Sequence, residues 1–286
     1  MSRLGASVAC VALVTSTLAA HPTSGRQRAE RDLSPKALAA LATKYVTAYR
    51  AAFAFLVADE AYVQVVSDAG GFEQQRRTLL GELFLTYLEA DHEWMAVHDF
   101  ATVGGRPVPD REDLRALLRQ GTTAPIMRRV ASHNARFNIG AVERDFNEPT
   151  LALLVLEEQR IGNFSVGRKL VTQDGGTALA VLEFVERRRP TIVSSKVSGP
   201  VFSRGEITIE TATGRVRRTR IAFQDGPILA ELGTTYALEP KLDLWVPSVF
   251  SERYDVKDET SGAREVIMCE ANYTNYRRFE VTGRIR

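Results

Sequence analysis

Apolar residues in the first third of the chain follow a helical pattern. Leu38, Leu41 and Tyr45 recur every three or four positions, and the preceding Ser34-Pro35 supplies an N-cap and a first-turn proline. We therefore expect a helix over residues 34–57.

The pattern then changes to strands. Residues 61–66 are β-prone, and residues 76–89 are apolar on both parities, which favours a long strand covered on both faces but also fits a buried helix. Residues 92–103 follow and are expected to form a further strand. The side chains on its apolar-rich face are Trp94, Ala96, His98 and Phe100.

Three helical or apolar segments interrupt the strands before the pattern returns to β. We expect a short helix capped by Asp110 and ended by Gly121, and a second helix that opens at Pro125 and ends before Gly140; a third apolar run follows Pro149. The remaining chain reads as strands separated by Gly-containing turns. The expected strands are 162–171, 177–187, 191–197, 206–212, 215–224, 228–239, 245–256, 264–276 and a short one at 277–283.

Consecutive strands joined by short turns pair antiparallel, and nine or more of them curl rather than lie flat. The predicted fold class is α+β and β-dominated: a curved antiparallel sheet or half-open β-barrel, with an N-terminal helix and a few covering helices. We expect one such domain over residues 33–286.

The first residues have the layout of a secretory signal peptide. A basic start at Arg3 precedes an uncharged apolar stretch, and small residues at Ala19-Ala20 precede a polar segment. The stretch is short for a membrane span, so we expect a cleaved signal over 1–20 and a flexible leader over 21–32. An uncleaved anchor and lipidation at Cys10 are the alternatives.

Charge and cysteine content narrow the function classes. With 37 Lys and Arg against 35 Asp and Glu, the chain is nearly neutral, which argues against nucleic-acid binding. After signal removal Cys269 is the only cysteine, so no intramolecular disulfide forms, and its place in a strand favours a buried apolar role. We expect no membrane span in the mature chain.

Motifs for catalysis or metal binding are missing from the sequence. His92 and His98 share a strand face but lie about 20 Å apart, too far to hold one metal ion. His133 is in phase with apolar residues and is expected to be a core residue. The sequence contains no Gly-x-Ser-x-Gly, Walker or GxGxxG motif. We therefore predict no catalytic, cofactor or metal residues and a chain that is not an enzyme.

The densest basic cluster comprises Arg215, Arg217, Arg218 and Arg220, which a strand divides between its two faces. Glu206 and Glu210 on the preceding strand can lie opposite them. A charge-paired hairpin is the favoured interpretation, and a contact with anionic lipid or a partner protein is the alternative.

Several segments resemble a group of exported bacterial proteins of unknown function. They are Val103-Gly104-Gly105-Arg106-Pro107, Arg136-Phe137-Asn138-Ile139-Gly140, Leu244-Trp245-Val246-Pro247 and Tyr273-Thr274-Asn275-Tyr276. The order of elements is also similar to that of the periplasmic lipoprotein carrier and sorting proteins. That resemblance implies a half-barrel with an apolar cavity for acyl chains and no catalytic motif.

Two functions follow as hypotheses. The chain is a non-enzymatic carrier or sensor of an acyl chain or lipoprotein, or it is an envelope structural or interaction module without a small-molecule ligand. For the first we expect an apolar cavity on the concave face of the sheet, of about 300 Å³ or more. The candidate cavity residues are Trp94, Phe100, Phe184 and Trp245.

Overall fold

The computed structural model describes most of the chain after the expected leader. The described residues are 33–53, 55–88, 92–111, 114–119, 124–142, 144, 148–195, 197–257 and 262–279. The expected signal peptide and leader, residues 1–32, therefore lie outside the described residues, as does most of the expected strand 277–283.

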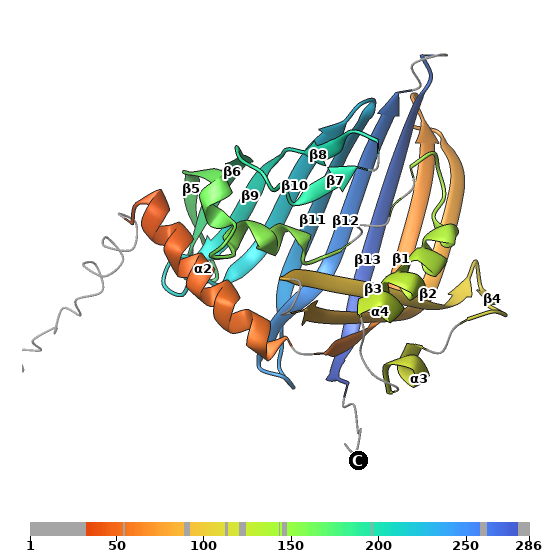
Figure 1. Ribbon diagram of the computed structural model, residues 1–286, viewed down its shortest axis with the longest axis horizontal. Helices are drawn as coiled ribbons and strands as arrows, with labels where there is room; N and C mark the ends of the chain where they lie inside the picture. The colour runs from red at the N-terminus through yellow and green to blue at the C-terminus, as the bar shows by residue number, and fades with distance from the viewer. Residues whose placement is uncertain are drawn as a thin grey trace, which may run out of the picture.

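One curved antiparallel sheet of eleven strands dominates the described residues (Figure 1). Across the sheet the strands run β4 (Arg106–Pro107), β3 (Glu93–Val103), β2 (Glu73–Leu88), β1 (Leu56–Asp68), β13 (Arg264–Arg278), β12 (Leu244–Lys257), β11 (Ile228–Glu239), β10 (Val216–Asp225), β9 (Ser203–Glu210), β6 (Thr177–Glu186) and β5 (Phe164–Asp174). A small hairpin of β7 (Val193–Ser195) and β8 (Gly199–Val201) stands apart. The predicted fold class is confirmed, and the sheet stays open because its end strands β4 and β5 do not pair.

The chain order explains why helices cover this sheet. β4 and β5 are consecutive strands in the sequence but opposite ends of the sheet, so the segment between them must span the width of the sheet. That segment carries the helices α3 (Leu114–Arg119) and α4 (Ala124–Asn134) and the 3₁₀-helices η1 (Ala135–Phe137), η2 (Leu151–Leu156) and η3 (Ile161–Asn163). The N-terminal helix α2 (Pro35–Ala52) and η2 pack on the main core face of the sheet, whereas α3 and α4 pack against the other face of β1–β3; α2 and α4 lie over different parts of the sheet (Figure 1).

The N-terminal helix is shorter than its apolar spacing predicts. α2 ends at Ala52 instead of residue 57, and Phe55 takes a positive φ of 45°. The apolar residues from Leu56 onward belong to β1, where they pair with both β2 and β13. The same strand begins five residues earlier than expected, because strand pairing on both sides outweighs a continuing helical pattern.

The other expected elements are confirmed with shifted bounds. The segment expected at 76–89 is the strand β2, described from Glu73 to Leu88, and not a buried helix; the strand expected at 92–103 is β3, which begins at Glu93. The expected helix over 125–140 ends at Asn134 before a 3₁₀ turn. The run after Pro149 is the 3₁₀-helix η2, in which all six residues are buried. Of the strand expected at 277–283, Arg277 and Arg278 belong to the end of β13, and residues 280–283 lie outside the described residues.

The two faces of the sheet differ in character. Alternate residues of the strands point inward to one large apolar core, against which α2 and η2 pack. A second, smaller cluster lies on the other face of β1–β3, where Met127 and Val130 of α4 pack with Met95 and Val97. No helix in the described part of the chain is both long and apolar enough to cross a bilayer. The single domain over 33–286 stays a prediction.

Candidate functional site

β3 has a free edge that side chains cap. On this side β3 pairs with β4 at Thr102 and Val103, and the residues before them have no strand partner among those that the structure describes. The Ala96 N–H donates to Glu148 Oε1 at 2.8 Å, and Asn134 Nδ2 donates to the His98 carbonyl. Such capping satisfies an exposed strand edge and blocks sheet extension.

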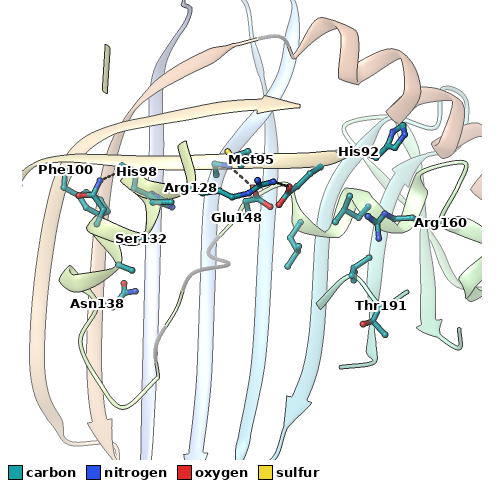
Figure 2. Close-up of a pocket in the computed structure, with 18 residues that line it drawn as sticks. His92, Met95, His98, Phe100, Arg128, Ser132, Asn138, Glu148, Arg160 and Thr191 are labelled. Atoms are coloured by element: carbon teal, nitrogen blue, oxygen red, sulfur yellow. Dashed lines mark hydrogen bonds and ion pairs between the residues drawn. The ribbon is translucent and has the colours of Figure 1, made fainter. Parts of the chain in front are cut away.

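A cavity of about 490 Å³ lies along this edge, between β3, α4 and the segment from η2 to β7 (Figure 2). Its apolar wall consists of Met95, Ala96, Phe100, Ala131, Ala135, Leu151, Leu154 and Ile192. Its polar lining consists of His92, Glu93, His98, Arg128, Ser132, Asn134, Asn138, Glu148, Arg160 and Thr191. In Figure 2, Glu148 and Arg128 are in the middle, His98 is at one end, and His92 and Arg160 are at the other.

Glu148 is the electrostatic centre of the cavity. Burial of its carboxyl group, with repulsion from Glu93, raises its pKa to about 8, although the Ala96 N–H favours the charged form. At neutral pH this carboxyl is therefore mainly protonated and adds little charge to the cavity. Arg128 is held by Glu93 at 2.8 Å, and Arg160 lies 3.7 Å from the buried carboxylate of Glu157.

The centre of the concave face is filled, and its polar groups contact each other. His98 Nδ1 lies 2.8 and 2.9 Å from the two oxygens of the buried Glu60 carboxylate. Tyr62 donates to Glu252 Oε1 at 2.5 Å, and Tyr254 donates to the other oxygen. Burial raises the pKa of both tyrosines well above the ordinary value, so they act as hydroxyl donors to a carboxylate.

Arg144 fastens the segment 138–144 to this centre. Its side chain is fully buried; Nη2 donates to Gln64 Oε1 at 2.7 Å and Nη1 to the Ile139 carbonyl at 3.0 Å. Gln64 Oε1 also accepts the Ile139 N–H at 2.9 Å. At Gly140, φ is 88° and a Cβ would approach Ile267 to 2.5 Å, so only glycine lets the segment lie this close to β13.

The four candidate cavity residues have different surroundings. Phe100 lines the cavity beside β3. Trp94 and Phe184 are buried in the main core, where Trp94 packs on Tyr49, Phe53 and Tyr87. Trp245 is half-buried beneath the Arg217 guanidinium, 4.1 Å from its ring centroid. A role for any of them in ligand binding stays a prediction.

The histidines and the cysteine are placed partly as expected. His92 and His98 are at opposite ends of the cavity in Figure 2. His133 is half-exposed, 3.9 Å from Asp110, so the expectation of a core residue was wrong: its helix turns it to the rim of α4. Cys269 is buried on β13, as predicted, and burial raises its pKa to about 12. Within the described ranges no three His, Cys, Asp or Glu side chains could share a metal ion.

The arginine cluster of β10 is largely charge-paired, as predicted. Arg215 and Arg217 each lie 3.1 Å from the buried carboxylate of Glu210. Arg220 pairs with Glu231 of the next strand, whereas Glu206, which stands opposite Arg220 in the register, binds Lys169.

Several residues of the site were missed in the sequence. Glu60 and Gln64 share a parity with the buried Ala58, Tyr62 and Val66, so a polar residue on an apolar strand face was the available signal. Glu148, Asn134 and Arg144 gave no such signal, because they lie outside strands and reach β3 or β1 only through the fold.

Comparison with known proteins gives structural likeness only. No protein-family model and no curated protein matches the chain. Among solved structures, it is similar to an outer membrane lipoprotein-sorting protein domain from Vibrio parahaemolyticus, at 10% identity and a TM-score of 0.34, covering 82% of this chain and 90% of that one. It is also similar to a DUF1329 family protein from Desulfovibrio piger, at 11% sequence identity and a TM-score of 0.37. This match covers 88% of this chain and 96% of that one.

A third likeness is to the Pseudomonas aeruginosa MucA/MucB complex, at 8% identity and a TM-score of 0.20, covering 83% of this chain and 98% of that one. The resemblance to lipoprotein-sorting proteins that the sequence predicts is thus confirmed as a likeness. At these identities and TM-scores it carries no function over to this chain.

Proposed function

We propose that the chain is an exported, non-enzymatic binding protein that carries or senses an acyl chain, free or borne by a lipoprotein, in the cavity beside β3. The observation that supports this proposal is the cavity itself. Its volume of about 490 Å³ falls in the range of small-molecule sites, and eight apolar residues contribute to its lining. Export is proposed from the signal-like residues 1–20.

The polar lining fits a ligand with one charged end. The protonated Glu148 leaves the middle of the cavity nearly uncharged, which suits a hydrocarbon chain. Arg160 stands at the other end of the cavity from His98, where an anionic head group would meet a cation. The ligand is therefore expected to be amphipathic, with a carboxylate or phosphate at its head.

A filled cavity tests the proposal. Ala131 lines the cavity from α4, so Ala131→Trp should occupy it and weaken binding of a fluorescent fatty acid at least about tenfold, or ~1.4 kcal/mol. Ala222→Trp adds the same side chain on β10, away from the cavity, and should bind within about twofold of the wild type. Mass spectrometry of the purified wild type should find a co-purified lipid.

A folded wild type that carries no lipid and binds no fatty-acid probe would contradict the proposal. The interaction-module hypothesis would then remain. Equal loss in Ala131→Trp and Ala222→Trp would place binding elsewhere than in this cavity.

A further inference from the structure

Four exposed arginines gather where β6 ends. Arg187, Arg188 and Arg189 follow the last residue of β6, and Arg204 stands on β9. The register pairs Arg204 with Val185, two residues before the run, so β9 brings the fourth arginine beside the other three. We call this group the arginine rim.

The arginine rim lacks the charge pairing of the β10 cluster. None of its four side chains has an ion-pair partner among the residues that the structure describes. The acid next to it in sequence, Glu186, is buried; its oxygens accept the Ile192 N–H at 2.9 Å and the Ser203 N–H and hydroxyl at 3.0 and 2.8 Å. That carboxylate is used inside the fold and does not neutralise the rim.

An exposed aromatic residue accompanies these charges. Phe202 is 46% exposed and precedes Arg204 by two residues in an extended segment, so both side chains point to the same side. Unpaired arginines beside an exposed phenylalanine are typical of surfaces that bind the interface of an anionic bilayer. The ring enters the boundary between head groups and acyl chains, and the guanidinium groups bind phosphates.

The rim also continues into the cavity wall. Thr191 and Ile192, which are separated from the arginine run by Pro190, line the cavity, as does Arg160. Asn163, near Arg160, donates its side chain to the Pro190 carbonyl and accepts the Arg187 N–H at 2.8 Å, which fixes the loop.

We propose that the arginine rim, with Phe202, docks the protein on the surface of an anionic phospholipid bilayer. Docking there would place one end of the cavity near the lipid head groups. The inference goes beyond the proposed function and stands without it, because an empty protein would present the same surface.

Vesicle co-sedimentation tests this docking. The wild type should bind vesicles of 30% phosphatidylglycerol in phosphatidylcholine, bind pure phosphatidylcholine poorly, and dissociate as salt rises. Each arginine near such a surface is worth about fivefold, so Arg187→Ser/Arg188→Ser/Arg189→Ser should bind about 100-fold more weakly. Phe202→Ser should weaken binding about fivefold at all salt concentrations.

The matched control is Arg218→Ser/Arg253→Ser/Arg264→Ser, which removes the same charge from exposed positions on β10, β12 and β13. It should bind within about threefold of the wild type. An equal loss of vesicle binding in the control triple would mean that the effect depends only on net charge, and this would overturn the proposal. A wild type that does not bind anionic vesicles would also overturn it.

Two competitors identify other partners. Displacement by millimolar glycerophosphate would show a site for a small anion, and displacement by polyglutamate would assign the rim to an acidic protein; either overturns bilayer docking. The rim triple should keep fatty-acid binding in the cavity, so failure of docking and failure of the proposed function are read separately.

Discussion

The concave side of the sheet buries polar groups in two places, and the two are built differently. At the centre, the Arg144 guanidinium, Gln64 and the Glu252 carboxylate meet other protein groups in a packed interior. At the β3 edge, Glu148 and Asn134 bond to a strand that lacks a neighbour, and an open space of about 490 Å³ remains beside them.

The difference separates a structural polar network from a candidate site. A buried network whose members bond to one another specifies the packing of a core and leaves no room for a ligand. Polar groups that line an open cavity can still form hydrogen bonds with a ligand that enters it. We therefore expect substitutions at the centre to change the free energy of unfolding. Substitutions at the β3 edge should change the pH dependence of stability and the binding of a ligand.

The largest effect should follow from Arg144→Met. The change leaves Gln64 Oε1 and the Ile139 carbonyl with fewer donors and removes the positive charge near Glu252. Loss of one partner in a buried charged network costs about 3–5 kcal/mol of unfolding free energy. Urea unfolding should show this loss, whereas Arg218→Met at an exposed position should stay within about 0.5 kcal/mol.

Cys269 provides a second measurement on the same variant. In the wild type the thiol is buried and its pKa is about 12, so thiol reagents should label the native protein very slowly. Arg144→Met should label faster as segment 138–144 loosens. An unchanged labelling rate together with unchanged stability would mean that Arg144 does not fasten this segment.

The sequence predicted the sheet better than the site, for physical reasons. Alternation of apolar side chains is a local signal, so β3 and the strands after residue 160 could be placed from it. The helical pattern before residue 57 overran because Leu56 and Val57 are apolar in either structure. All six residues of η2 are apolar and buried, so the segment has no alternation of polar and apolar positions that could distinguish a helix from a strand.

The site depends on contacts that are distant in the sequence. Glu148 caps Ala96 across 52 residues, and Arg144 reaches Gln64 across 80. Neither residue stands in a motif, and most of the outer edge of β3 lacks a strand partner among the described residues because β4 is only two residues long. Only a fold that places these segments together reveals the cavity.

An intermediate effect is expected from Glu148→Gln at the edge. Because the folded pKa of about 8 exceeds the ordinary value of 4.5, the native state binds a proton that the unfolded state has lost. Stability should therefore fall as pH rises from about 4.5 to 8 and then level off. The residue is partly exposed, so the fall is expected to be on the order of 1–2 kcal/mol.

Glu148→Gln keeps an acceptor for the Ala96 N–H but cannot titrate, so this part of the pH dependence should vanish. Urea midpoints at pH 5, 6, 7 and 8 measure it, with Glu158→Gln, an exposed acid, as the matched control. Parallel pH profiles for wild type and Glu148→Gln would show that the carboxyl is not held in its protonated form.

The smallest effect on stability is expected near Trp245. This residue is less buried than the polar network around Arg144 and lies outside the cavity. Arg217 lies over its ring and also pairs with Glu210, so Arg217→Ser should cost about 1 kcal/mol of unfolding free energy. The chain has two tryptophans, and Trp94 is fully buried, so acrylamide quenching of fluorescence should report mainly on Trp245. Arg217→Ser should raise that quenching, and Arg220→Ser, whose charge is bound by Glu231, should leave it unchanged. Equal quenching in all three proteins would mean that the guanidinium does not shield the ring, and that Arg217 is held in place by its ion pairs with Glu210 and Asp174.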